Sequence, residues 1–247
     1  MGKTEYYRKT LRTLADWDRF LLQESGLPGP RANLELVNVV ADEGTQAQFK
    51  HFLTFDERKA PRNSQQEFLA VCGVVGMGEV LKQGNPEALK ILRAAASDSR
   101  WRVREGVAIA LQRFGDTDME GLLSEMERWS RGSFLEMRAA AASLCEPRLL
   151  KQAEHAIEVL IILDRITKSI SSAKDRNTDD FKALRKSMGY CWSVAVAANP
   201  DTGISMMEHW ISTKDKDIRW IMRENLKKKR LQRIDAGWVQ DCLVRLV

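Results

Sequence analysis

Basic side chains gather near the C-terminal end of this sequence. Residues 214–233 hold nine lysines and arginines against three acids, although the whole chain has a net charge of only +5. Four of these basic residues, together with Trp220, recur at helical spacings of three and four: Arg219, Trp220, Arg223, Lys227 and Arg230. Such spacing predicts a basic stripe along one helix edge that binds phosphates with a steep salt dependence. The alternative is a solvated helical cap at the end of a repeat array.

Residue types for other chemistries are sparse. The three histidines, His51, His155 and His209, lie far apart, and the sequence has no P-loop, dinucleotide-binding or nucleophile-elbow motif. The glycines of GVVGMGEV stand in a helical stretch, where they indicate close helix packing rather than a phosphate-binding loop. We therefore predict no metal site and no cofactor.

The four cysteines are scattered through apolar helical segments, with no C-x-x-C pair: Cys72, Cys145, Cys191 and Cys242. They are predicted to be buried free thiols, which is typical of the reducing cytoplasm. No apolar run is long enough to span a membrane, and the charged N-terminal segment lacks the apolar core of a secretion signal. The expected location is cytoplasmic.

A short phrase recurs and predicts how the basic residues are positioned. An acidic residue is followed six positions later by arginine in Asp98–Arg104, Asp179–Arg185 and Asp217–Arg223, and a copy that begins at Gly132 ends at Arg138. The arginines are about 34, 47 and 38 residues apart, a spacing typical of helix-pair repeats. Such arginines can form an internal ladder between repeats or can contact a ligand, and both interpretations stay open.

The local patterns predict about a dozen helices. The first extends over residues 4–24, and two more cover 32–43 and 45–54. A capping box of Ser64 and Glu67 is predicted to open the next apolar run, and Asn85-Pro86 and Asn199-Pro200 to start later helices. We expect one domain over residues 1–247: an N-terminal helical cap (1–60), repeats (64–233) and a C-terminal helix (234–247).

One segment also resembles a known family. RKSMGYCWSVAVAANPD, residues 185–201, and the Trp101, Arg104, Leu111 and Gln112 pattern are similar to the HEAT-like alkylpurine DNA glycosylase and DNA-alkylation-repair family. The resemblance covers roughly residues 64–230. It implies an all-α, HEAT-like α-solenoid of stacked antiparallel helix pairs, and a basic concave face on which arginine and aromatic side chains hold the DNA backbone.

The sequence departs from this family at the catalytic position. The family's glycosylases carry a Trp and an Asp one helical turn apart, but the corresponding segment QQEFLAVCGVVGMGEVL has neither. Trp101 and Glu105 have the right spacing in a different repeat, so Glu105 is the candidate carboxylate that would stabilise positive charge on the sugar. Trp192 is predicted to be a core residue.

The sequence therefore predicts a DNA-binding HEAT-like protein that grips the duplex backbone, with the departure arguing against glycosylase activity. The alternative is a non-enzymatic scaffold that binds a protein partner on the concave face. The expected nucleic-acid-binding residues are Trp101, Arg104, Arg185, Lys186, Tyr190, Arg219, Arg223, Lys227, Lys228, Lys229 and Arg230.

Overall fold

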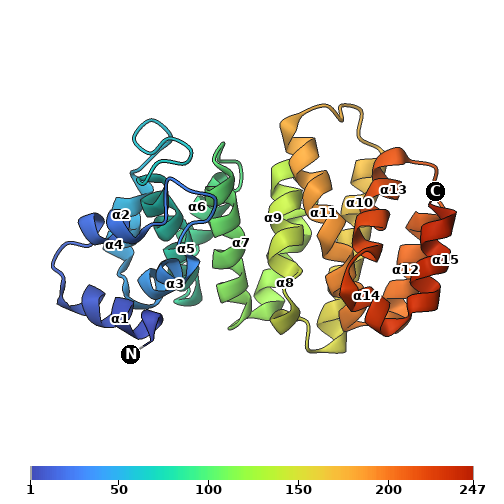
Figure 1. The fold of residues 1–247 in the computed structure, drawn as a ribbon, viewed down its shortest axis with the longest axis horizontal. Helices are drawn as coiled ribbons and strands as arrows, with labels where there is room; N and C mark the ends of the chain where they lie inside the picture. Colours follow the sequence, from blue (N-terminus) through green and yellow to red (C-terminus); the bar gives the residue numbers. More distant parts are fainter. Residues whose placement is uncertain (1, 247) are drawn as a thin grey trace. The chain divides into compact units, whose positions relative to one another are not determined.

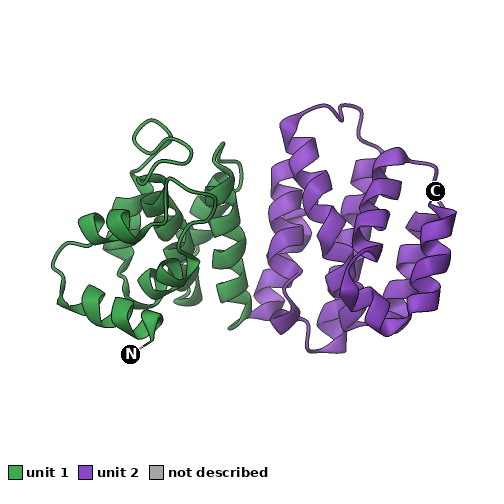
Figure 2. Cartoon of the chain, in the orientation of Figure 1, with its two compact units in different colours: residues 1–117 green, residues 118–247 purple. Residues whose placement is uncertain are grey.

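The computed structural model describes residues 2–246, and every regular element in that range is a helix (Figure 1). The all-α class expected from the sequence is therefore confirmed for the described chain. The helices group into two compact units, residues 1–117 and residues 118–247 (Figure 2). No composition shift or linker in the sequence marks the boundary between these units, and the single domain over residues 1–247 stays a prediction.

The first unit contains seven helices in its described part: α1 (Lys3–Thr13), α2 (Asp18–Glu24), α3 (Leu34–Glu43), α4 (Gln46–Leu53), α5 (Glu67–Lys82), α6 (Glu87–Ala95) and α7 (Trp101–Gly115). Its central helix is α5, which is apolar on every side and packs against α3, α4, α6 and α7. A helix without a polar face must be enclosed by its neighbours, so α5 forms the core of this unit.

Glycines allow the neighbours of α5 to approach closely. A Cβ atom added at Gly78 would lie 2.5 Å from the backbone oxygen of Ala110 in α7. One added at Gly76 would collide with the Phe49 ring of α4. The predicted role of these glycines in close packing is confirmed.

The N-terminal helix expected over residues 4–24 is wrong in one respect, because the chain breaks between α1 and α2. Leu14 is extended, and the Trp17 indole turns inward to donate a hydrogen bond of 2.9 Å to the Leu11 carbonyl. Burial of Trp17 in the core thus outweighs helix continuity, which periodicity alone favoured.

The capping box expected at Ser64 and Glu67 is only half formed. The Glu67 amide donates to the Ser64 hydroxyl at 3.3 Å, but the Glu67 carboxylate accepts from the Asn63 amide instead of from Ser64. It also forms an ion pair of 3.1 Å with Arg102 of α7 and is fully buried. The tertiary partner Arg102 therefore determines where the Glu67 side chain lies.

The second unit contains eight α-helices in its described part: α8 (Met119–Trp129), α9 (Phe134–Leu144), α10 (Ala153–Ser171), α11 (Asp179–Ala198), α12 (Pro200–Ile211), α13 (Lys216–Leu226), α14 (Lys229–Ile234) and α15 (Ala236–Arg245). A short 3-10 helix covers Pro147–Leu149. The predicted start of α12 is confirmed, since Asn199 accepts from the Thr202 amide and Pro200 occupies the first turn.

Helices α9, α11 and α13 lie side by side and run in the same direction. Early residues of α9 and α11 meet at Phe134 and Phe181, whose rings are 5.4 Å apart. Late residues of α11 and α13 meet at Asn225, which donates to the Met188 carbonyl and accepts from the Ser193 amide, both at 2.8 Å. The amino-terminal ends of these helices therefore lie at one edge of this layer.

A second layer in the same unit is formed by α8, α10 and α12, each of which packs against its sequence neighbour in the first layer. Trp192 of α11 is fully buried, with its indole donating 3.0 Å to the Thr167 hydroxyl of α10. Its predicted place in the core is confirmed. All four cysteines are likewise buried, and none of them forms a disulfide bond.

Candidate anion-binding site

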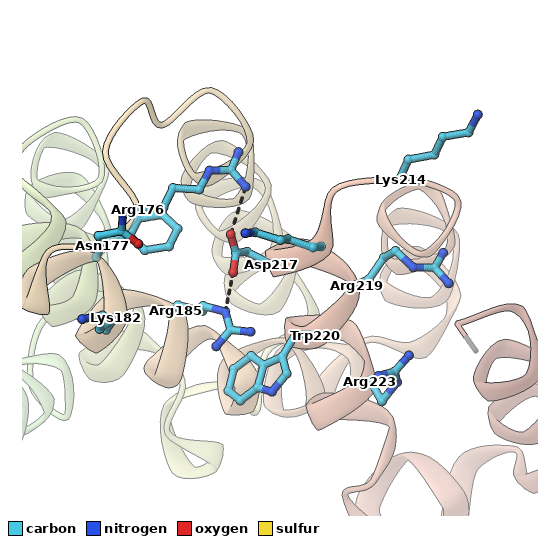
Figure 3. A pocket seen from close by; sticks show the side chains of 11 residues that line it. Arg176, Asn177, Lys182, Arg185, Lys214, Asp217, Arg219, Trp220 and Arg223 are labelled. Carbon is cyan, nitrogen blue, oxygen red and sulfur yellow. Dashed lines mark hydrogen bonds and ion pairs between the residues drawn. The ribbon is translucent and has the colours of Figure 1, made fainter.

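A basic pocket of about 660 Å³ opens within the second unit, between the loop after α10, the first half of α11, and α13 with the loop before it (Figure 3). Seven of its lining residues are cationic: Arg176, Lys182, Arg185, Lys214, Lys216, Arg219 and Arg223. The other lining residues are Asn177, Phe181, Asp217 and Trp220. One carboxylate against seven cations makes this pocket suited to a polyanion.

The capped first turns of α11 and α13 position cationic side chains at the pocket. Thr178 caps α11 by accepting from the Phe181 amide, and Asp215 caps α13 by accepting from the amides of Asp217 and Ile218. Because α11 and α13 are parallel neighbours, their first turns present Lys182 and Lys216 at the same edge of the unit. The positive ends of both helix dipoles add to this charge.

Two ion pairs organise the pocket floor. Asp217, only 7% exposed, lies between two guanidinium groups: Arg176 at 3.0 Å and Arg185 of α11 at 2.8 Å (Figure 3). The Arg185 contact is an ion pair rather than an aligned hydrogen bond, because its Nε–H does not point at the carboxylate oxygen. Asp217 thus ties the loop after α10 to α11 and α13.

Arg176 also pairs with Asp215, at 2.7 Å. Burial alone would raise the pKa of Asp215, but the hydrogen bonds from Arg176 and from the helix amides outweigh it and hold this pKa below its ordinary value of 3.8. The same contacts raise the pKa of Arg176. Both groups are therefore charged at neutral pH, and the loop is held electrostatically.

A stacked pair lies beside this network. The Arg185 guanidinium carbon lies 3.9 Å from the centre of the Trp220 ring. Gly189, one turn further along α11, lets the same ring pack against the helix backbone, since an added Cβ would lie 3.1 Å from Trp220 Cζ3. Trp220 is therefore held between Arg185 and α11.

Three pocket cations form no ion pair with any carboxylate that the structure describes. No carboxylate among the described residues lies within ion-pair distance of Lys214, Lys216 or Arg223, and Arg223 bonds only the neutral Leu246 carbonyl. Lys182 has one exposed ion pair, with Asp179 at 3.5 Å. Arg219 donates to the Thr213 and Arg245 carbonyls. The charges of Lys214, Lys216 and Arg223 are therefore available to an anionic ligand.

The single basic stripe predicted from spacing is wrong, because α13 ends at Leu226. Lys227 caps that helix and pairs with Glu224 at 2.5 Å, while Lys229 begins the separate helix α14. Arg219, Trp220 and Arg223 therefore line the pocket, and residues 227–230 do not. The cap interrupts the helical periodicity on which the prediction depended.

Lys228 and Arg230 contribute to a second, smaller cluster. Arg230 donates 2.6 Å to the hydroxyl of Tyr190, and its guanidinium lies 4.8 Å from the ring centre. Lys228 approaches the same ring at 5.8 Å, and Lys186 is exposed one turn earlier on α11. Tyr190 is 42% exposed, so this cluster lies on the surface.

The remaining predicted site residues belong to the first unit. Arg104 donates to the carbonyls of Asp98 and Ser99, which anchors the loop that precedes its own helix. Trp101 is 38% exposed, with the Arg102 guanidinium 4.5 Å from its ring. Glu105 is exposed on α7. The structure places none of these three in the pocket of the second unit.

Sequence reasoning missed Arg176, Lys182 and Asp217 as site residues. The only signals were the charge-rich loop of residues 171–180 and the recurrent acidic residue before an arginine. Neither signal indicates that Arg176 contacts a residue 41 positions later in the chain.

Metal and membrane features are absent from the part of the chain that the structure describes. No group of three or more His, Cys, Asp or Glu side chains there is arranged to hold a metal ion. Nor does any described helix have the length and apolar character needed to cross a bilayer.

Comparisons with known proteins add little. No protein-family model matches the chain, and no curated protein matches it. Among solved structures, the chain is similar to a crystal structure of an engineered protein, a Northeast Structural Genomics Consortium target, with 14% identity and a TM-score of 0.38. The match covers 94% of this chain and 98% of the other. So low a TM-score carries no argument about fold or function.

Proposed function

We propose that this protein binds duplex DNA through the sugar–phosphate backbone, using the basic pocket of the second unit. The observation that carries the proposal is the convergence of seven cationic side chains on one pocket that contains a single, already paired carboxylate. Phosphate contacts by lysine and arginine supply most sequence-independent affinity for DNA.

The pocket favours phosphates over bases. Its two aromatic rings offer little stacking surface, since Phe181 is 1% exposed and Trp220 is held between Arg185 and α11. Stacking on an open aromatic face is how most proteins hold unpaired bases. The proposed binding is therefore independent of sequence.

The HEAT-like solenoid is part of the same proposal. It is supported in the second unit by parallel helices α9, α11 and α13 in one layer, with α8, α10 and α12 packed behind them. The Arg185–Asp217 pair links α11 to α13 as the rung of an internal ladder would. Arg185 thus makes the structural contact, and in this proposal it also contacts the ligand.

The proposal does not extend to base excision. The carboxylate of the pocket, Asp217, is committed to two guanidinium groups, and the sequence candidate Glu105 belongs to the other unit. A carboxylate that stabilises a cationic transition state must face the reacting sugar. Related alkylation-repair activity therefore has no geometric support in the pocket.

The test is duplex-DNA binding by fluorescence anisotropy across a salt series, comparing Lys216→Glu with Lys151→Glu. Both lysines are exposed and both changes alter the charge equally. Lys151 precedes α10 and Arg176 follows it, so about 28 Å of helix separates Lys151 from the pocket loop. We expect Lys216→Glu to weaken binding about tenfold or more, and Lys151→Glu to change it little.

Other outcomes reject the proposal. No binding by the wild type at low salt leaves the pocket as a surface for an acidic protein partner, the scaffold alternative. Equal losses in the two variants point to diffuse charge rather than the pocket.

An abasic duplex serves as a third probe, and a clear preference for it favours the repair relationship implied by the resemblance.

A further inference from the structure

The Arg185 side chain is held on two sides and open on a third. Its Nε atom lies 2.8 Å from an Asp217 carboxylate oxygen in an ion pair, and its guanidinium carbon lies 3.9 Å from the Trp220 ring centre. Its two terminal nitrogens have no hydrogen-bond partner among the described residues. Arg185 lines the pocket (Figure 3), and its side chain is 28% exposed.

A guanidinium fixed in this way suits one particular ligand geometry. Its terminal nitrogens form a planar fork that matches two oxygens of a phosphate group, whereas a lysine ammonium acts only as a point charge. An unrestrained arginine loses side-chain rotamer entropy when it binds. An arginine already held by an ion pair and a stacked ring loses less.

Asp217 is the unexpected member of this site. An acid in an anion-binding pocket repels the ligand, and Asp217 is one of the residues that line this pocket. Yet it is 7% exposed and pairs with guanidinium groups from two separate elements, Arg176 and Arg185. Its repulsion is therefore offset locally, while its geometric effect on both arginines remains.

We propose that Asp217 and Trp220 hold Arg185 as a preorganised fork for one backbone phosphate, which makes Asp217 a positioning residue for anion binding. This inference rests on the proposed function. It predicts the opposite change in DNA affinity from a purely electrostatic account. If Asp217 acted only through its charge, its removal would strengthen DNA binding. If Asp217 positions the fork, its removal weakens DNA binding.

The experiment measures duplex-DNA affinity for Asp217→Asn and for the matched control Asp179→Asn. Asp179 is fully exposed in the first turn of α11, near the same pocket, and pairs only with Lys182 at 3.5 Å. Both substitutions remove one negative charge. We expect Asp179→Asn to bind equally or up to about threefold tighter, and Asp217→Asn to bind about tenfold weaker.

A double-mutant cycle separates positioning from general stability. Arg185→Lys keeps the charge but loses the fork, and it is expected to weaken binding about tenfold. If Asp217 acts through Arg185, then Asp217→Asn has little further effect in the Arg185→Lys background. Thermal unfolding of each variant identifies any loss of fold. Arg185 is partly exposed, so Arg185→Lys still tests the fork if Asp217→Asn does not fold.

The outcomes are distinct. Unchanged or tighter binding by folded Asp217→Asn overturns the inference but leaves the proposed function intact. Additive effects of the two substitutions also overturn it, because independent sites add. Failure of the wild type to bind DNA instead rejects the proposed function.

Discussion

At the scale of single residues, Asp215 has two roles. It caps α13 through the amides of Asp217 and Ile218, and it pairs with Arg176 across the loop after α10. These contacts hold its pKa below 3.8 in the folded state. A carboxyl whose folded pKa is lowered stabilises the fold above its unfolded pKa, and this contribution is lost as the pH falls through the folded pKa.

We predict that Asp215→Asn lowers the free energy of unfolding by about 1 kcal/mol at pH 7, because asparagine keeps the helix cap but loses the charge. The difference from the wild type should shrink once the pH falls below 3.8, the ordinary pKa of this group. Urea unfolding of both proteins at several pH values measures this. A difference that does not change with pH contradicts the electrostatic cause.

At the scale of elements, close contacts between helices depend on glycines, which have no side chain to keep the helices apart. Gly78 of α5 faces the backbone of α7, where nothing can move aside for a Cβ. Gly106 of α7 is also buried, but an added Cβ would meet only valine methyl groups, at 3.4 Å or more. The two glycines therefore differ in packing although both lie inside helices.

The two glycines are expected to respond to alanine in opposite directions. Gly78→Ala should destabilise the fold by about 1–3 kcal/mol through overpacking. Gly106→Ala should stabilise it by up to about 1 kcal/mol, since alanine favours the helix and fits the available space. Thermal unfolding followed by circular dichroism measures both changes. Equal effects of the two substitutions argue against so close an approach of α5 to α7 at Gly78.

At the scale of the whole molecule, the net positive charge is small, but cationic side chains are concentrated in the pocket of the second unit. The sequence has 39 basic and 34 acidic residues, so a net charge of +5 gives only modest long-range attraction for DNA. The pocket places seven cations around about 660 Å³. Affinity should therefore depend on short-range phosphate contacts made in one unit.

In the proposed complex, the number of phosphate contacts determines how steeply DNA affinity falls with salt. In the proposed DNA complex, five of the pocket cations contact phosphates: Lys182, Arg185, Lys214, Lys216 and Arg223. Each neutralised phosphate contributes about −0.9 to the slope of log K against log salt, so a slope of about −4 to −5 is expected. Anisotropy titrations at a series of salt concentrations measure it. Retained binding with a slope near zero means that phosphates are not the ligand.

Much of the local structure could be predicted from the sequence, because local contacts determine it. Asn199-Pro200 starts a helix through a cap that spans four residues, and Trp192 and the glycines of α5 follow from apolar periodicity. Prediction failed where distant partners intervene. Trp17 breaks the first helix to reach the core, and Glu67 turns to Arg102, 35 residues away.

The candidate site divides in the same way. The sequence by itself determined an all-helical chain with a basic C-terminal segment, since helix caps and charge are properties of neighbouring residues. Only the tertiary structure decided which cations converge. Parallel packing of α11 and α13 brings Arg185, Asp217 and Trp220 together, and the loop after α10 adds Arg176. Such contacts depend on how helices pack, which spacing along the chain does not specify.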